Sequence, residues 1–189
     1  MRRIRSLLLS MLALLCLSAC TGKESGAKAA AQIAEKYSGA SLEARLEMTA
    51  DYGERVYVFT AEYSGSAGEG KITILAPSNI AGVSARIEDG GTKLEYDGVE
   101  LNTGRLTDGD VSPMNATTGL MAAWSESGGA QCSRETLGGT KCLRLESPLD
   151  DDTSQTTWFD ESTLLPLRSE IISAGRAVLV ITFANAAVR

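Results

Sequence analysis

The stretch VSARIEDGGTKLEYDGVEL, residues 83–101, decides the fold of this chain. Charged or polar residues alternate with apolar ones over residues 83–88, the period-two pattern of a strand with one solvated and one dry face. Glycine-containing turns at 89–91 and 97–98 then separate three short strand patterns. The stretch therefore predicts consecutive antiparallel hairpins.

Similar strand patterns extend in both directions from this stretch. They cover residues 42–49, 56–63, 71–76, 83–88, 94–96, 99–101, 131–137, 140–146, 153–160, 165–172 and 177–183. The spacing of a parallel β–α–β unit is not found, which favours an antiparallel meander. Roughly ten strands exceed the five or six of an average sheet, so we expect this sheet to curl.

Two helical patterns accompany the strands. Residues 29–37 place apolar side chains on one face, and Gly39 is suited to end that helix. A second helix is predicted from Ser112, an N-cap followed by proline, to about Ser127. The chain is thus predicted to be α+β and mainly β, with a strongly curved antiparallel sheet around one or two helices.

The N-terminus has the features of a bacterial lipoprotein signal. An arginine-rich start and the apolar run Leu7–Leu17 precede Leu17-Ser18-Ala19-Cys20, which resembles a lipoprotein cleavage site with Cys20 as the acylated residue. The apolar run is well short of the roughly 20 residues of a transmembrane helix. A diacylglyceryl group, with palmitate as a typical acyl chain, would hold the mature protein on the outer face of the cell membrane.

This signal divides the chain into three parts. Residues 1–19 are expected to be the signal peptide, and residues 20–28 the lipidated cysteine and a flexible tether. Residues 29–189 are expected to form a single domain, since their number suits one core. No membrane-spanning body is predicted.

Composition excludes several classes of function. The 189-residue chain has no histidine, which removes Ser-His-Asp and Cys-His catalysis and imidazole metal sites. Its formal charge is −6, and the mature chain reaches about −9 once Arg2, Arg3 and Arg5 are removed. Such a charge repels nucleic acid. We therefore expect no enzymatic activity, no metal, no nucleic-acid partner and no cofactor other than the acyl lipid on Cys20.

Several segments resemble the lipoprotein-carrier superfamily of LolA and LolB. They are Lys71–Pro77, Ile80–Val83, Leu94–Val99, Trp158–Asp160, Leu165–Glu170 and Val180–Phe183, and their order carries the resemblance. Within that superfamily the chain is similar to lipid-anchored members such as the clostridial germination lipoproteins called GerS. The resemblance implies a half-open barrel around helices, and either a hydrophobic ligand in its concave face or a scaffold for another envelope protein.

Cys132 and Cys142 are the two cysteines of the predicted domain. An extracytoplasmic location favours an intrachain disulfide, and an interchain disulfide in a homodimer or free thiols are the alternatives. Hairpin register opposes the intrachain bond. A two-residue turn at Gly138-Gly139 would pair Cys132 with Leu145 and put the two sulfur atoms on opposite faces.

Met114, Met121 and Trp124 share one face of the second predicted helix. Methionine adapts to different apolar ligands, so this face could line an apolar groove. Plain core packing against the sheet is the simpler interpretation.

Two other patterns fit surface turns better than sites. Gly65–Lys71 matches the GxxxxGK spacing of a phosphate loop but joins two strand patterns, and no helix follows it. The aspartates at 108, 110 and 150–152 lack the spacing of an EF-hand loop.

We therefore predict a membrane-anchored, extracytoplasmic binding or scaffold protein that serves another envelope protein, in spore germination or envelope maintenance. The alternative is a carrier or sensor of a hydrophobic ligand, an acyl chain or a lipoprotein. An empty apolar cavity beneath the helix at residues 114–124 would favour the carrier. A filled core with an exposed apolar patch or strand edge elsewhere would favour the scaffold.

Overall fold

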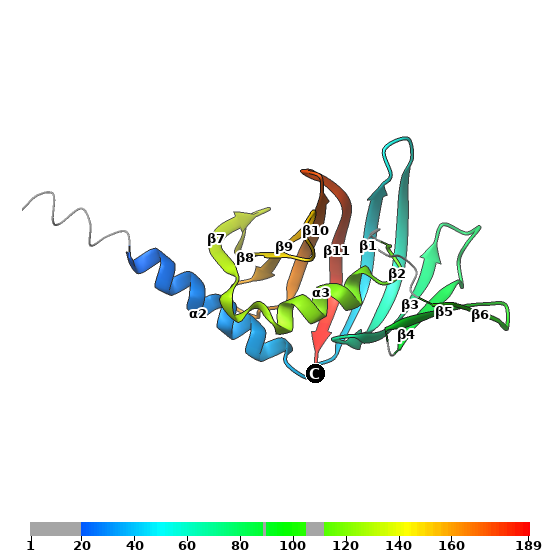
Figure 1. Ribbon diagram of the computed structural model, residues 1–189, viewed down its shortest axis with the longest axis horizontal. Helices are drawn as coiled ribbons and strands as arrows, with labels where there is room; N and C mark the ends of the chain where they lie inside the picture. The colour runs from blue at the N-terminus through cyan, green and yellow to red at the C-terminus, as the bar shows by residue number, and fades with distance from the viewer. Residues whose placement is uncertain (1–19, 89, 105–111) are drawn as a thin grey trace, which may run out of the picture.

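A single curved antiparallel sheet dominates the computed structural model, which describes residues 20–88, 90–104 and 112–189 (Figure 1). The strands are β1 Leu42–Asp51, β2 Val56–Ser66, β3 Glu69–Ala76, β4 Ser84–Glu88, β5 Gly91–Tyr96, β6 Val99–Gly104, β7 Gln131–Leu137, β8 Thr140–Pro148, β9 Thr153–Asp160, β10 Pro166–Ser173 and β11 Arg176–Val188. Their order is β6-β5-β4-β3-β2-β1-β11-β10-β9-β8-β7. The predicted meander and the mainly β class are confirmed.

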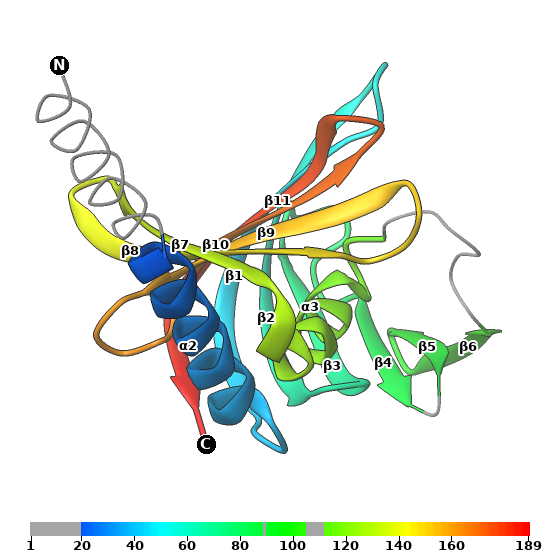
Figure 2. The ribbon, with the colours of Figure 1, turned by 60° about the vertical axis from the view of Figure 1, so that its left-hand side comes forward.

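The sheet does not close, so β6 and β7 are its two edges. Helix α3, Ala116–Ser125, crosses the concave face, and helix α2, Cys20–Tyr37, lies along the β7 side (Figures 1 and 2). A short 3-10 helix, Ser127–Gly129, follows α3 and contacts α2. Strands β4, β5 and β6, here called the arm, form the other end of the sheet.

One row of inward-facing residues runs from the centre of the sheet to the arm. Cross-strand pairing aligns Tyr63, Ile72, Ala85, Leu94 and Leu101 on β2 to β6. The first three are buried, Leu94 is half-buried, and Leu101 is 61% exposed. The inner face therefore loses its cover toward β6.

A second row runs from the centre to β7 and stays covered. It aligns Ile181, Ser169, Thr157, Leu145 and Cys132 on β11, β10, β9, β8 and β7. All are buried except Cys132, which is half-buried. The core therefore extends over the centre of the sheet and this half of it, but not to β6.

Helix α2 is longer than the sequence predicted. It begins at Cys20, whereas we expected a flexible tether over residues 20–28. A Cβ atom on Gly26 would lie 2.3 Å from the carbonyl oxygen of Cys132, so only glycine allows this close approach of α2 to β7. Arg134 of β7 also donates a hydrogen bond to the hydroxyl of Ser25. These contacts attach residues 25 and 26 to the domain.

Helix α3 is shorter than predicted. It begins at Ala116, after turns in which the Ser112 hydroxyl accepts a hydrogen bond from the Met114 amide at 3.2 Å. Neither described helix has the combination of length and apolar character that crossing a membrane requires. The predicted signal peptide, residues 1–19, lies outside the described residues.

Candidate functional site

Two of the three predicted groove residues fill the core beneath α3. Met121 and Trp124 are fully buried, and Met114 packs at the margin of the core. The Trp124 ring lies 5.1 Å from Tyr37 and 5.2 Å from Phe159, measured between ring centroids. Packed aromatic rings leave little space for a ligand, so this face of α3 is occupied by protein.

Polar contacts fix α3 in this position. The Trp124 indole N–H donates to the Thr157 hydroxyl at 3.0 Å, and the Tyr63 hydroxyl lies 3.2 Å from that of Thr118. Burial raises the pKa of Tyr63 to about 12, with a smaller opposing effect from Thr118. Both of these contacts, Trp124 with Thr157 and Tyr63 with Thr118, are between buried groups. Buried polar contacts favour one orientation of the helix.

An apolar pocket of about 310 Å³ opens along another side of α3. Its apolar lining includes Ile87 of the arm, Ala116 and Leu120 of α3, Ile171 of β10 and Leu149 of the loop after β8. These residues come from segments far apart in the chain. No sequence pattern joins them, so sequence reasoning missed this pocket.

The arm continues this apolar surface outward. Leu94 and Tyr96 of β5 pair with Leu101 and Val99 of β6, and the row from Tyr63 places these side chains on the inner face. Val99 is 70%, Leu101 61% and Tyr96 53% exposed. The alternating pattern of residues 99–101 identified their face, but only the strand order showed that nothing among the described residues covers it.

The tip of the β1–β2 hairpin is a second exposed apolar region. Val56 and Val58 are solvent-exposed, and Tyr57 is partly so. The Tyr57 ring contacts Tyr52 at 5.9 Å and Phe59 at 6.2 Å between centroids. Because its aromatic rings pack against one another, this hairpin buries part of its own apolar surface.

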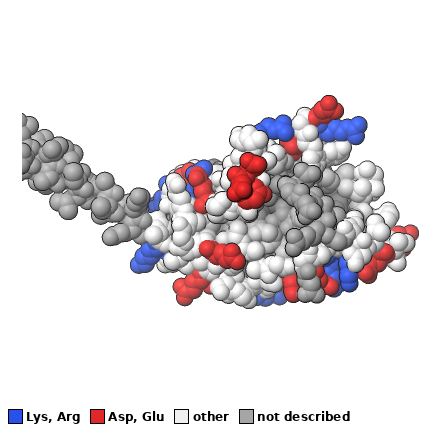
Figure 3. Space-filling view, in the orientation of Figure 1, with Lys and Arg blue, Asp and Glu red and all other residues white. Residues whose placement is uncertain are grey.

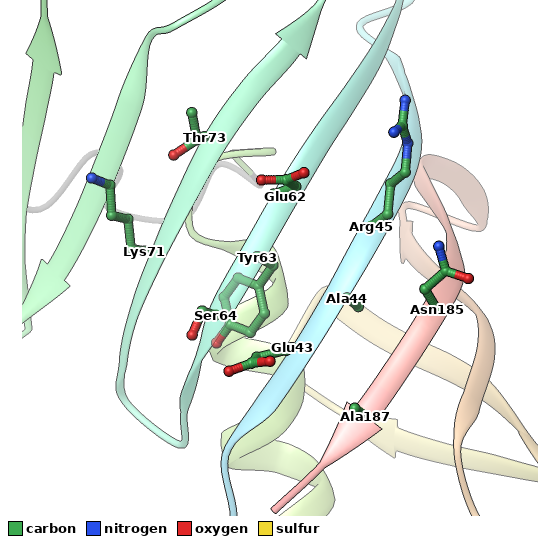
Figure 4. Close-up of a pocket in the computed structure, with 10 residues that line it drawn as sticks. All are labelled: Glu43, Ala44, Arg45, Glu62, Tyr63, Ser64, Lys71, Thr73, Asn185 and Ala187. Carbon is green, nitrogen blue, oxygen red and sulfur yellow. The ribbon is translucent and has the colours of Figure 1, made fainter.

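A polar depression of about 460 Å³ lies over strands β1, β2, β3 and β11 (Figure 4). Glu43, Arg45, Glu62 and Lys71 line it and are exposed. They occupy the outward positions of strands whose alternate residues are buried, and Arg45 faces Glu62 in the β1–β2 register. This depression is a solvated sheet face.

Cys132 and Cys142 form no disulfide with each other in this structure, so the structure does not support the expected intrachain bond. The two-residue turn forms as predicted and pairs Cys132 with Leu145 and Glu135 with Cys142, so the sulfur atoms lie on opposite faces. Desolvation raises the pKa of Cys132 despite the opposing influence of Arg134. The thiolate that nucleophilic chemistry needs is therefore disfavoured.

The other motifs give no reactive arrangement in the described part of the chain. No group of three or more histidine, cysteine or carboxylate side chains is placed to hold a metal ion there. Gly65–Lys71 spans a strand–turn–strand unit, and Asp150 caps a turn by accepting hydrogen bonds from the amides of Asp152 and Thr153. The aspartates at 108 and 110, and the side chain of Cys20, lie outside the described set.

Acidic and basic side chains are interspersed on the face drawn in Figure 3, and much of the surface between them, drawn in white, belongs to uncharged residues. Several ion pairs involve exposed side chains, such as Arg86 with Glu88 at 3.4 Å on the arm. Exposed pairs of this kind contribute little to stability.

No protein-family model and no curated protein sequence matches this chain. Among solved structures, it is similar to an uncharacterized conserved protein from Thermus thermophilus, with a TM-score of 0.53, 10% identity and coverage of 85% of this chain and 86% of that one. At this identity the likeness concerns the fold alone.

Two further solved structures have lower TM-scores. A LolA superfamily protein from Nitrosomonas europaea gives 0.43, with 14% identity and coverage of 87% of this chain and 94% of that one. The GerS lipoprotein, solved in complex with the CwlD amidase from Clostridioides difficile, gives 0.40, with 16% identity and coverage of 82% and 88%. The unclosed curved sheet around helices that the sequence resemblance implied is the architecture of this chain.

Proposed function

We propose that this chain is a lipid-anchored, extracytoplasmic binding protein that holds another envelope protein against the inner face of its arm. It performs no catalysis in this role. Cys20 carries the acyl lipid, and the arm carries the contact surface. Because the exposed side chains on the inner face of the arm are apolar, the partner is expected to contact them with apolar side chains of its own.

The contrast between a filled core and an exposed arm carries this proposal. Met121 and Trp124 occupy the space beneath α3, while Val99 and Leu101 expose most of their surface. Large apolar residues gathered on one exposed face are a feature of protein interaction sites. Strand β6 contributes no apolar residue to the buried core, so its apolar side chains favour an intermolecular role.

The expected anchor is compatible with this role. A diacylglyceryl group on Cys20 provides two acyl chains, which give a stable attachment to a bilayer. Helix α2 starts at Cys20 and is attached to β7 from Ser25 onward. A protein held in this way is restricted to one membrane and suits a fixed binding partner better than a shuttling carrier.

A hydrophobic-ligand carrier or sensor is the second candidate, and the 310 Å³ pocket beside α3 favours it. Its lining by Ile87, Leu120 and Ile171 suits an apolar group. That volume is at the low end for ligand pockets, which run from about 300 to 1,000 Å³. The pocket suits the end of an acyl chain or one large side chain of a partner.

Site-specific photocrosslinking in the native membrane tests the proposal. A photoreactive amino acid at position 99 should give one discrete protein adduct, identified by mass spectrometry. The matched control is the same probe at position 62, exposed on the outer face of β2, which should give none. A position-99 probe that captures only lipid would support the carrier instead, and equal adducts at both positions would refute a specific surface.

A Cys20→Ser variant tests the anchor separately. It should move the protein from the membrane to the soluble fraction and reduce the position-99 adduct. Retention of the variant in the membrane, with unchanged crosslinking, would show that Cys20 does not carry the attachment.

A further inference from the structure

Strand β6 ends the sheet with backbone groups directed away from it. Tyr96 and Val99 flank a two-residue turn in which Asp97 and Gly98 have φ of 50° and 76°, the type I′ geometry. The flanking pair exchanges hydrogen bonds, and bonded and non-bonded pairs alternate along an antiparallel ladder. Glu100 therefore belongs to a non-bonded pair, and its N–H and C=O point away from β5.

The two faces of this edge differ in chemistry. Val99 and Leu101 present apolar side chains on the inner face, and Glu100 lies between them on the outer face. Glu100 is opposite Glu95 on β5, and its nearest described cation is Lys93, at 3.9 Å. A strand added to this edge would meet apolar groups on one face and carboxylates on the other.

The usual protections of an edge strand are few here. Natural edges are blunted with lysine, proline, bulges or a covering element. The described residues of β6 include no lysine or proline, and no described strand pairs with its outer side. The pairing of β6 with β5 is irregular at the far end of the strand, where the register shifts between Thr92 and Lys93, and regular over residues 99–102. At the opposite edge α2 covers β7, and Arg134 is attached to that helix.

We propose that β6 binds an extended segment of a partner polypeptide by β-strand addition. The segment lies antiparallel to β6, places apolar residues beside Val99 and Leu101, and places a lysine or arginine opposite Glu100. Backbone hydrogen bonds supply affinity, and the alternating side chains supply selectivity. This inference rests on the proposed function and names its mode and the class of partner segment.

Charge selects this occupant over a second copy of the chain. The chain has a net charge of −6, and two copies paired antiparallel through β6 around Glu100 would place their Glu100 carboxylates opposite each other. Like charges near each other across strands are destabilising. A segment with a cationic residue meets the same edge with an attractive pair.

The probe is a labelled peptide with the core sequence Val-Thr-Val-Lys-Val, added to the mature lipoprotein in nanodiscs. Fluorescence anisotropy should report saturable binding, and hydrogen exchange should report protection of the Glu100 amide. Replacing the peptide lysine by glutamate should weaken binding about 2- to 5-fold, the range for a cross-strand charge pair. N-methylation of that lysine removes its N–H donor and should weaken binding more than 10-fold.

Variants of the protein complete the test. Glu100→Pro removes the outward N–H and should abolish binding, because edge strands accept proline while the added strand loses its donor. Leu101→Lys is a second variant that keeps the backbone intact and should weaken binding at least 10-fold. The matched control is Thr136→Pro on the exposed part of β7, which should leave binding unchanged.

Three results would overturn the inference. They are the absence of peptide binding, binding that survives both β6 variants, and concentration-dependent self-association that Glu100→Pro abolishes, which would make a second copy the occupant. A discrete photoadduct at position 99 together with an absent peptide complex would leave the proposed function standing and reject strand addition. Absence of both the photoadduct and the peptide complex would reject the proposed function and strand addition together.

Discussion

The two edges of the sheet have the same kind of inner face but different surroundings. Toward β7 the inward row ends in buried Leu145 and half-buried Cys132, and α2 lies over the edge. Toward β6 the row ends in Leu101, 61% exposed, with no described helix above it. The covered edge contributes to the core, and the uncovered edge is available for binding.

This difference shows that an apolar alternating strand does not by itself mark the core. Leu145 and Leu101 both occupy inward positions, and their neighbours in sequence alternate in the same way. What separates them is a helix about a hundred residues away from β7 in the sequence. Cover from distant elements therefore decides which apolar strand stabilises the fold and which can bind a partner.

Trp124 of α3 and Tyr96 of β5 should give the largest difference in stability between the covered and the uncovered part of the molecule. Trp124→Ala removes ring contacts with Tyr37 and Phe159 and should lower the free energy of unfolding by about 3–5 kcal/mol. Tyr96→Ala, on the exposed arm, should change it by less than about 0.5 kcal/mol. Urea unfolding followed by circular dichroism measures both, and similar losses would show that the end of β5 belongs to the core.

One leucine from each row, Leu145 on β8 and Leu101 on β6, allows the same comparison with a single residue type. Leu145→Ala should destabilise the protein by about 2–4 kcal/mol, because it leaves a cavity under α3 and α2. Leu101→Ala should cost less than about 0.5 kcal/mol and should weaken the β6 peptide complex. Thermal unfolding and peptide titration of both variants would reject the comparison if Leu101→Ala were the more destabilised.

Gly26→Ala tests whether α2 protects the β7 edge. The added Cβ would lie 2.3 Å from the Cys132 carbonyl oxygen, so α2 must move away, at a cost of about 1–3 kcal/mol. Hydrogen exchange at the Cys132 and Arg134 amides should become faster. Gly119→Ala is the control, since no atom lies within 4 Å of its added Cβ, and it should be neutral or stabilising by up to about 1 kcal/mol. Unchanged exchange in Gly26→Ala would mean that α2 is not the protecting element.

Asp160→Asn should give the smallest effect, at the turn that binds the other end of α2. The Asp160 carboxylate accepts hydrogen bonds from the hydroxyls and amides of Ser162 and Thr163. This turn presents the Leu164 carbonyl oxygen to the Tyr37 hydroxyl at 2.9 Å. The substitution should cost less than about 1 kcal/mol at neutral pH, because the group is solvent-accessible.

The contribution of the Asp160 carboxylate to stability should depend on pH. Hydrogen bonds, first from the Ser162 side chain and then from the Thr163 backbone, lower the pKa of Asp160 from 3.8 to about 2. Ionised Asp160 therefore stabilises the folded state above about pH 4, and this stabilisation is lost as the pH falls through about 2. The free energies of unfolding of the original protein and of Asp160→Asn, measured between pH 7 and pH 2, should converge as the pH falls. A difference that stays constant with pH would exclude the carboxylate as its cause.

Strand patterns, turns and hairpin register were readable from the sequence because each depends on residues close together. The pairing of Cys132 with Leu145 follows from one two-residue turn, and it already opposed the disulfide that the cellular location favoured. The start of α2 was not readable, because Ser25 and Gly26 are held by contacts with β7 more than a hundred residues away. Their polar and small side chains resemble a tether when that contact is unknown.

By itself, the sequence determined the mainly β meander, its turns and the exclusion of histidine chemistry, since these follow from local periodicity and composition. It also indicated Cys20 as the residue to be acylated. Only the tertiary structure decided that Met121 and Trp124 are core residues, that Ile87, Leu120 and Ile171 line one pocket, and that β6 is the uncovered edge. Burial and exposure depend on which distant elements meet, and no local pattern encodes that meeting.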